Sequence, residues 1–281
     1  RRAPPAEEQM TDISIRKTGR AGRITLSRPE ALNALTHDMC LAIDAALREW
    51  AADTDVAMLI IDAEGEKAFC AGGDIAEMYA SGLRGDYEYG RRFWRDEYRM
   101  NARLFQFPKP VASFMQGFTM GGGVGVSCHG SHRIVAESSR IAMPECGIGL
   151  VPDVGGSLLL AQAPGRLGEY LGLTGARMGP GDAIHAGFAD CYIPEADWPA
   201  LIEVLERTGE WTMIDRSCVT PPESRLAALQ PEIAQRHQHL PDGAQHLVGG
   251  QLDALAGGGI DFTPLQGLPD RRAIGPVGVD R

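Results

Sequence analysis

Short apolar segments that lead into glycine-rich turns, and then into segments with helical spacing, constrain the fold of this chain more than any other feature. The runs at 56–62 and 111–115 are continuously apolar, as expected of buried strands. Glycine clusters at 72–73 and 121–123 lie between such segments and helical patterns. Recurrence of these units along residues 12–193 indicates an α/β protein.

The remaining elements follow from the same patterns. Apolar or alternating segments predict strands at 12–16, 22–26, 134–136, 141–143 and 189–193. Helical spacing predicts helices at 86–106, 155–163, 166–174, 182–187, 198–208 and 223–238. A further helix is expected to begin after Thr36, a typical N-cap residue, and to run to Trp50.

Composition divides the chain into four regions. Residues 1–10 lack an apolar stretch, which predicts a disordered extension. The strand and helix pattern predicts a core over residues 11–195 and a helical C-terminal region over 196–240. Periodicity is lost over 241–281, where glycine and proline are frequent, so this region is predicted to be an atypical Gly/Pro-rich tail.

Charge and cysteine content argue against several classes of function. The formal net charge of −10 disfavours nucleic acid, because phosphate backbones need a basic face. No apolar run approaches the roughly 18 residues of a membrane span, so no membrane partner is predicted. The six cysteines form no CxxC pair, and the seven histidines have no acidic or thiol partner at ligand spacing. We therefore predict no metal, and reduced, buried thiols in a cytoplasmic protein.

The two glycine clusters stand where a strand gives way to a helix. Glycine allows positive φ and lets a ligand approach the main chain closely. The start of a helix leaves N–H groups that point outward, and two such groups converging on one point form an oxyanion hole. Either cluster alone is more often an ordinary turn, and neither fits a dinucleotide or P-loop motif.

Two carboxylates lie in apolar, glycine-rich surroundings. Glu145 follows Met143 and Pro144, and Asp153 comes eight residues later. Desolvation raises the pKa of a carboxylate and suits it to proton transfer, and two nearby carboxylates can divide the roles of acid and base. The alternative is that either residue caps a helix; for Asp153, just ahead of Gly155, the spacing supports both interpretations equally.

Four segments, taken together and in this order, resemble the crotonase superfamily: 69–75, 117–125, 143–145 and 152–156. The resemblance covers about residues 12–215, and within the superfamily it is strongest to the 3-hydroxyisobutyryl-CoA hydrolases. It implies a spiral of repeated ββα units with C-terminal helices. It also implies hydrolysis of a short-chain 3-hydroxyacyl-CoA thioester, 3-hydroxyisobutyryl-CoA in valine catabolism, with coenzyme A as part of the substrate and no cofactor.

The resemblance assigns roles to particular positions. The backbone N–H groups of Gly73 and Gly122 would bind the thioester oxygen. Glu145 matches the main catalytic carboxylate, and Asp153 matches the second acid of the hydrolases. The implied substrate-binding positions are Asn33, Ala34, Ala71, Gly72, Asp74 and Gly121. The flanking cations Arg28 and Lys67 are candidates for binding the CoA phosphates, with the alternative that both are solvated surface charges.

Gly125 distinguishes the expected thioester hydrolysis from enoyl-CoA hydration. Enoyl-CoA hydratases carry a second catalytic glutamate at the matching position, so its absence favours hydrolysis over hydration. Enoyl-CoA hydratase or isomerase activity is kept as one alternative, and an inactive acyl-CoA-binding remnant as another. Beyond residue 236 the sequence departs from the family pattern, which predicts a truncated C-terminal part and leaves a homo-oligomer open.

Overall fold

The computed structural model describes residues 12–237, so the predicted extension at 1–10 and the tail at 241–281 lie outside the described residues. Its larger sheet has six strands in the order β1 (Ile13–Thr18), β2 (Ala21–Leu26), β3 (Met58–Ala63), β5 (Val111–Met115), β7 (His132–Val135) and β9 (Cys191–Tyr192). Only the β1–β2 pair is antiparallel; the other neighbouring strands of this sheet are parallel. The continuous apolar runs of β3 and β5 are buried, as predicted.

A second, smaller sheet has three parallel strands in the order β4 (Ala68–Cys70), β6 (Phe118–Met120) and β8 (Arg140–Ala142). The sequence pattern predicted turns rather than strands around β4 and β6. Strands of three residues are too short to show the alternation by which a strand is found in a sequence. This small sheet matters because each of its strands leads directly into one part of the candidate site.

Most helices occupy segments in which a helix was predicted; α9 was not predicted. Their bounds are α1 (His37–Ala52), α2 (Ile75–Leu83), α3 (Tyr87–Phe105), α4 (Gly122–Ser127), α5 (Gly156–Gln162), α6 (Leu167–Thr174), α7 (Pro180–His185), α8 (Trp198–Thr208), α9 (Thr212–Ser217) and α10 (Arg225–His237). Short 3₁₀ helices span Pro29–Ala31, Glu145–Ile148 and Glu195–Asp197. The predicted N-cap is confirmed: the hydroxyl of Thr36 accepts a hydrogen bond from the Met39 N–H at 3.2 Å.

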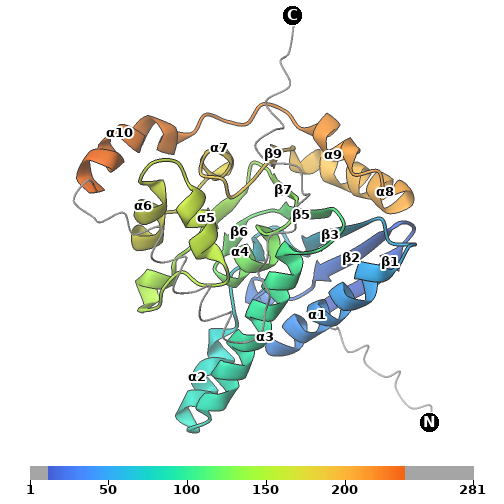
Figure 1. Ribbon diagram of the computed structural model, residues 1–281, viewed down its shortest axis with the longest axis horizontal. Coiled ribbons are helices and arrows are strands. Elements are labelled where there is room, and N and C mark those ends of the chain that lie inside the picture. Colours follow the sequence, from blue (N-terminus) through green and yellow to red (C-terminus); the bar gives the residue numbers. More distant parts are fainter. Residues whose placement is uncertain (1–11, 238–281) are drawn as a thin grey trace, which may run out of the picture.

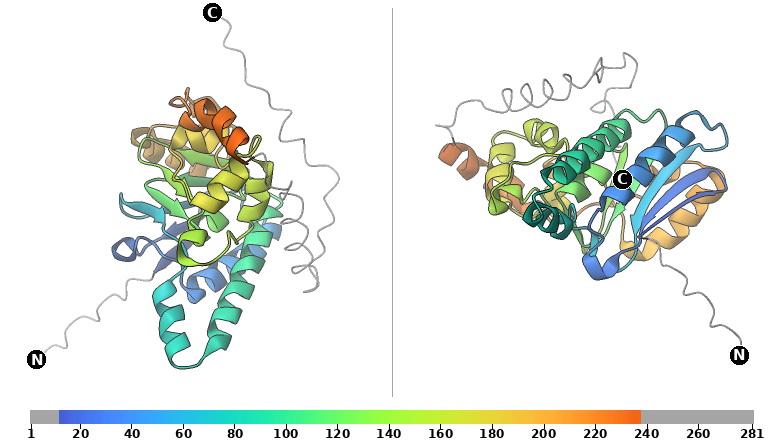
Figure 2. Two further views of the ribbon diagram at one scale, coloured as in Figure 1. Left: turned by 90° about the vertical axis from the view of Figure 1, so that its left-hand side faces the viewer. Right: turned by 90° about the horizontal axis from the view of Figure 1, so that it is seen from below.

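Helices cover both faces of the six-stranded sheet (Figure 1). One face packs with α1, α3 and α4 in the main core, through side chains such as Leu59, Ile61 and Met115. The opposite face, with Met58, Ile60 and Phe114, packs against α8 and α9 in a second core. The helices α2 and α3 extend beyond the sheet as a hairpin, which is visible in two directions (Figures 1 and 2).

Cys191 and Cys218 form a disulfide that joins β9 to the end of α9, with their Cα atoms 5.6 Å apart. The prediction of six reduced thiols is therefore wrong for this pair, because residues 27 apart in sequence meet only once the chain is folded. Cys40, Cys70 and Cys128 are buried free cysteines, and burial raises the pKa of each thiol. Among the described helices, none is long and apolar enough to cross a bilayer.

Candidate active site

The ends of the three short strands bring the candidate residues together. β4 leads into Gly72 and Gly73, β6 leads into Gly121 and Gly122, and β8 leads into the turn that carries Glu145. The strands are parallel neighbours, with Met120 paired to Ala142. The carboxyl ends of parallel strands lie at the same edge of a sheet, and ligands bind there in many α/β proteins. Three segments distant in sequence therefore face one point.

The two predicted oxyanion-hole amides lie side by side. A Cβ atom placed on Gly122 would be 3.1 Å from the amide nitrogen of Gly73, and one placed on Gly72 would be 3.8 Å from the amide nitrogen of Gly122. Neither N–H donates to any acceptor within residues 12–237. Buried backbone donors are nearly always paired. Two adjacent free N–H groups are thus available to a ligand oxygen.

Glu145 lies against these amides. A Cβ atom on Gly121 would come within 2.7 Å of its Oε1, and Gly121 itself has a φ of +51°. The side chain is buried, and its Oε2 has no hydrogen-bond partner in the described part of the chain. Burial, reinforced by the charge of Asp153, raises the pKa of Glu145 to about 7. A carboxyl with this pKa can take up or release a proton near neutral pH.

One contact holds Asp153 itself and another holds the residue that follows it. The hydroxyl of Tyr98, on α3, donates to its Oδ2 at 2.6 Å. The ring of His129 lies 2.7 Å from the carbonyl oxygen of Val154, a residue with a φ of +49°. Burial raises the pKa of Asp153, and the hydrogen bond from Tyr98 opposes that rise. The alternative that Asp153 caps the next helix is wrong, since the N-cap of α5 is Gly155 with no side-chain bond.

Glu97, a third carboxylate, was not found by sequence reasoning. It enters from α3, is 2% exposed, and its Oε1 would touch a Cβ atom on Gly122 at 2.7 Å. That oxygen has no partner among the described residues. Burial, with the charges of Asp153 and Glu145, raises the pKa of Glu97 to about 8. The apolar face of its helix, with Phe93 and Leu104, was the sequence signal that a lone acidic residue was buried there.

The raised pKa of Glu97 predicts that stability falls with pH. A folded-state pKa of about 8 against a model value of 4.5 means that the folded chain binds the proton more tightly than the unfolded chain. This stabilisation is complete below about pH 4.5 and is lost as the pH rises towards 8. Glu97→Gln keeps a neutral side chain at every pH. Its Tm is expected to fall less than that of the wild type between pH 5.5 and pH 8.5 in thermal melts.

The exposed Glu203, on α8, provides the matched control for that experiment. Glu203→Gln should follow the wild-type dependence of Tm on pH. Parallel curves for the wild type and Glu97→Gln would contradict a neutral buried carboxyl at position 97.

Three predicted ligand-binding residues, Arg28, Asn33 and Asp74, hold the loop at 28–35. Asn33 is fully buried; its amide donates to the carbonyls of Glu64 and Ala68, and its Oδ1 accepts from the Arg28 N–H. Both terminal nitrogens of Arg28 donate to Asp74 at 3.1 Å, and Asp74 also caps α2. The side chain of Arg28 therefore has internal anionic partners, which disfavours its predicted role in binding a CoA phosphate.

Three further predicted positions, Ala34, Ala71 and Gly72, border the site through their main chains. Leu35 and Gly72 are joined by a 2.8 Å backbone hydrogen bond, and Ala71 donates to Leu32, so the 28–35 loop lies beside the first glycine turn. Ala34 lies in that loop, where its carbonyl accepts from Arg28. Lys67 is exposed and has no ion-pair partner among the described residues. Of the two cations predicted for the CoA phosphates, only Lys67 is free of internal partners in this part of the chain.

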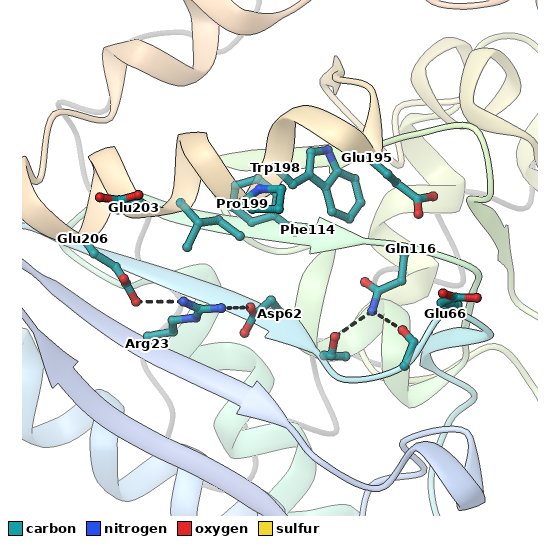
Figure 3. Close-up of a pocket in the computed structure, with 13 residues that line it drawn as sticks. Arg23, Asp62, Glu66, Phe114, Gln116, Glu195, Trp198, Pro199, Glu203 and Glu206 are labelled. Carbon is teal, nitrogen blue, oxygen red and sulfur yellow. Dashed lines mark hydrogen bonds and ion pairs between the residues drawn. The ribbon is translucent and has the colours of Figure 1, made fainter.

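A separate cavity of about 470 Å³ lies between the six-stranded sheet and α8 (Figure 3). Arg23 there donates to Asp62 at 2.5 Å and to Glu206 at 2.8 Å, and Gln116 donates to two backbone carbonyls. None of the candidate catalytic residues lines this cavity. No cluster of three or more metal-ligating side chains occurs within residues 12–237. The candidate site at the edge of the small sheet is thus separate from this cavity.

Comparison with known proteins shows the family of the chain. The model of the enoyl-CoA hydratase/isomerase family matches residues 21–247. A mitochondrial 3-hydroxyisobutyryl-CoA hydrolase from Danio rerio is 44% identical over 197 residues, which cover 70% of this chain and 50% of that protein. The chain thus spans about half the length of this curated relative. The relative's mitochondrial location does not support the cytoplasmic assignment, which stays a prediction.

Solved structures share the fold. A crystal structure of an enoyl-CoA hydratase from Rhodobacter sphaeroides is 62% identical, with a TM-score of 0.76 over 80% of this chain and 66% of that one. A carnitinyl-CoA dehydratase from Mycobacterium thermoresistibile is 42% identical, with a TM-score of 0.77 over the same shares. The predicted α/β class and crotonase fold are confirmed. The chain belongs to the enoyl-CoA hydratase/isomerase family, the crotonase superfamily that its glycine turns and carboxylates resemble.

Proposed function

We propose that this chain hydrolyses the thioester of a short 3-hydroxyacyl-CoA, with 3-hydroxyisobutyryl-CoA as the substrate. The observation that carries the proposal is the pair of free N–H groups, on Gly73 and Gly122, beside the buried carboxyl of Glu145. A thioester carbonyl that accepts from both amides would be polarised for attack, and the charge of a tetrahedral intermediate would be stabilised there. The name of the Danio rerio relative supports the same reaction.

Glu145 is the proposed proton acceptor. In the direct route, water attacks the carbonyl carbon while Glu145 takes its proton; the C–S bond then breaks and the sulfur leaves with that proton. In the covalent route, Glu145 attacks the carbonyl carbon, the C–S bond breaks, and coenzyme A leaves as the thiolate, which gives an anhydride. Water then opens the anhydride, restores the Glu145 carboxylate and supplies the proton that the thiolate takes up. Asp153, fixed by Tyr98, would orient the water or the substrate hydroxyl in either route.

Glu97 is the proposed neutral partner in this site at pH 7. Its raised pKa leaves it mostly protonated at that pH, so it can donate one hydrogen bond and accept another. A second negative charge beside Glu145 would oppose the developing oxyanion, and protonation of Glu97 avoids that charge.

The test is thiol release from a panel of CoA esters by the full chain. Hydrolysis of 3-hydroxyisobutyryl-CoA is expected to exceed that of isobutyryl-CoA, with no hydration of crotonyl-CoA. Water addition to crotonyl-CoA with no thiol release would replace the hydrolase with the family's other reaction. Tight binding of the esters without turnover of any of them would identify an acyl-CoA-binding remnant.

Enoyl-CoA hydration is the second candidate, because the structure places a second glutamate in the site that the sequence analysis had not found there. Gly125 leaves no glutamate on α4, yet Glu97 reaches the same site from α3. Two buried glutamates beside an oxyanion hole can supply the acid and the base for adding water to a double bond. The Rhodobacter sphaeroides protein is also named a hydratase. Crotonyl-CoA in the panel decides between the two reactions.

A further inference from the structure

Asn101 is a buried amide that no hydrogen bond explains. It lies on α3, one helical turn beyond Glu97, and is 4% exposed. Both its Oδ1 and its Nδ2 are buried, and neither has a hydrogen-bond partner among the described residues. An unpaired buried polar group is costly and rare in native proteins, so an amide with two such atoms indicates a place where a polar ligand binds.

The position of this amide connects it to the candidate site. A Cβ atom on Gly125 would lie 2.8 Å from the Nδ2 of Asn101, 3.1 Å from its Oδ1 and 2.8 Å from the Cβ of Val154. The amide therefore fills the space that Gly125 leaves open. Gly125 lies one turn of α4 beyond the oxyanion-hole residue Gly122, and Val154 directly follows Asp153.

The chemistry of the amide selects the kind of ligand. Its Nδ2 can donate and its Oδ1 can accept, so a group that does both is its natural partner. A hydroxyl has one donor and two acceptor positions. A carboxylate would leave Nδ2 satisfied and Oδ1 facing negative charge, and an apolar group would satisfy neither atom.

We propose that Asn101 binds the hydroxyl of the 3-hydroxyacyl chain and determines the preference for hydroxylated over plain acyl thioesters. The inference rests on the proposed function and adds a specificity-determining residue to it. Gly125 permits the contact because any side chain there would occupy the place of the amide. A site built to bond a hydroxyl discriminates strongly against an analogue without one, since its polar atoms are then left unpaired.

Asn101→Leu tests this assignment, because leucine has a similar size and no polar atoms. The wild type is expected to prefer 3-hydroxyisobutyryl-CoA to isobutyryl-CoA in kcat/KM. The variant should lose at least tenfold on the hydroxylated ester and stay within threefold of the wild type on isobutyryl-CoA. An equal loss on both esters would overturn the proposal, because a structural role or a role in holding the attacking water would affect both.

Two further measurements keep the outcome clear. Asn101→Ala and Arg95→Ala should both melt cooperatively. Arg95 is an exposed residue of the same helix, so Arg95→Ala should keep the wild-type preference for the hydroxylated ester. Equilibrium binding of the two esters separates the inference from the proposed function. Suppose that the wild type releases no thiol but binds the hydroxylated ester more tightly than isobutyryl-CoA, and that Asn101→Leu abolishes this difference in binding. That result would support the hydroxyl subsite and reject the hydrolase. No preference in binding or turnover by the wild type would reject the subsite.

Discussion

Glu145→Gln should lower kcat for thiol release from 3-hydroxyisobutyryl-CoA by about 10³-fold, the range for loss of a general acid–base or nucleophilic group. Glutamine keeps the shape of the side chain but can neither take a proton from water nor attack the thioester. The pKa of Glu145, raised to about 7, further predicts that wild-type kcat rises with pH through that value, since the ionised form is the one that acts. Stopped assays of free thiol over pH 5.5–8.5 measure both effects.

Glu49→Gln is the matched control, because Glu49 is an exposed carboxylate of α1 outside the site. It should retain the rate and the pH profile of the wild type. A Glu145→Gln variant that folds and keeps its rate within tenfold of the wild type would remove Glu145 from the mechanism. The same limit applied to Asp153→Asn tests the second carboxylate.

Gly122→Ala is the second change with a large expected effect, a loss of about 10² to 10³-fold in kcat. The added Cβ would lie 2.7 Å from Oε1 of Glu97 and 3.1 Å from the amide nitrogen of Gly73. The Glu97 oxygen is the end of a flexible side chain and can turn away, but the Gly73 nitrogen belongs to the backbone, so the two glycine turns must move apart by a few tenths of an ångström. The N–H groups would then no longer converge on one oxygen, and hydrogen bonds made in the transition state would be lost.

Gly147→Ala is the control for this substitution. Gly147 is exposed in the turn after Glu145, and a Cβ there meets no atom within 4 Å. Alanine at 147 should leave kcat unchanged. Both variants are compared by thermal melting, because a loss of activity in Gly122→Ala counts only for a chain that still unfolds cooperatively near the wild-type Tm. Full activity in a folded Gly122→Ala would show that the second amide is not used.

Local patterns in the sequence were enough to predict the long elements of the fold. Continuous apolar runs predicted β3 and β5, and helical spacing with a threonine cap predicted α1. These signals act within a few residues, so they do not depend on what the chain meets elsewhere. The three-residue strands β4 and β6 escaped prediction because their order comes from pairing with each other and with β8.

Some residues of the candidate site could also be predicted from local sequence, and others could not. The glycine turns, Glu145 and Asp153 were marked by residue type and by apolar neighbours close in sequence. Glu97 was not, because it lies in a charged helical segment. The apolar face of that helix indicates that the residue is buried, but only the packing of α3 against α4 shows that its carboxyl lies beside Gly122. Arg28 was predicted to bind a ligand from its position in the chain, and only the structure shows its ion pair with Asp74, 46 residues away.

The sequence alone determined the α/β class, the family and the turns that can expose backbone amides, since each depends on a short run of residue types. Tertiary structure alone decided which groups share one site: the convergence of three strand ends, the entry of Glu97 and Asn101 from α3, and the pairing of Cys191 with Cys218. The physical reason is that burial and nearby charges set the pKa of a carboxyl, and burial also decides whether an amide has a hydrogen-bond partner. Both depend on contacts between segments that only folding brings together.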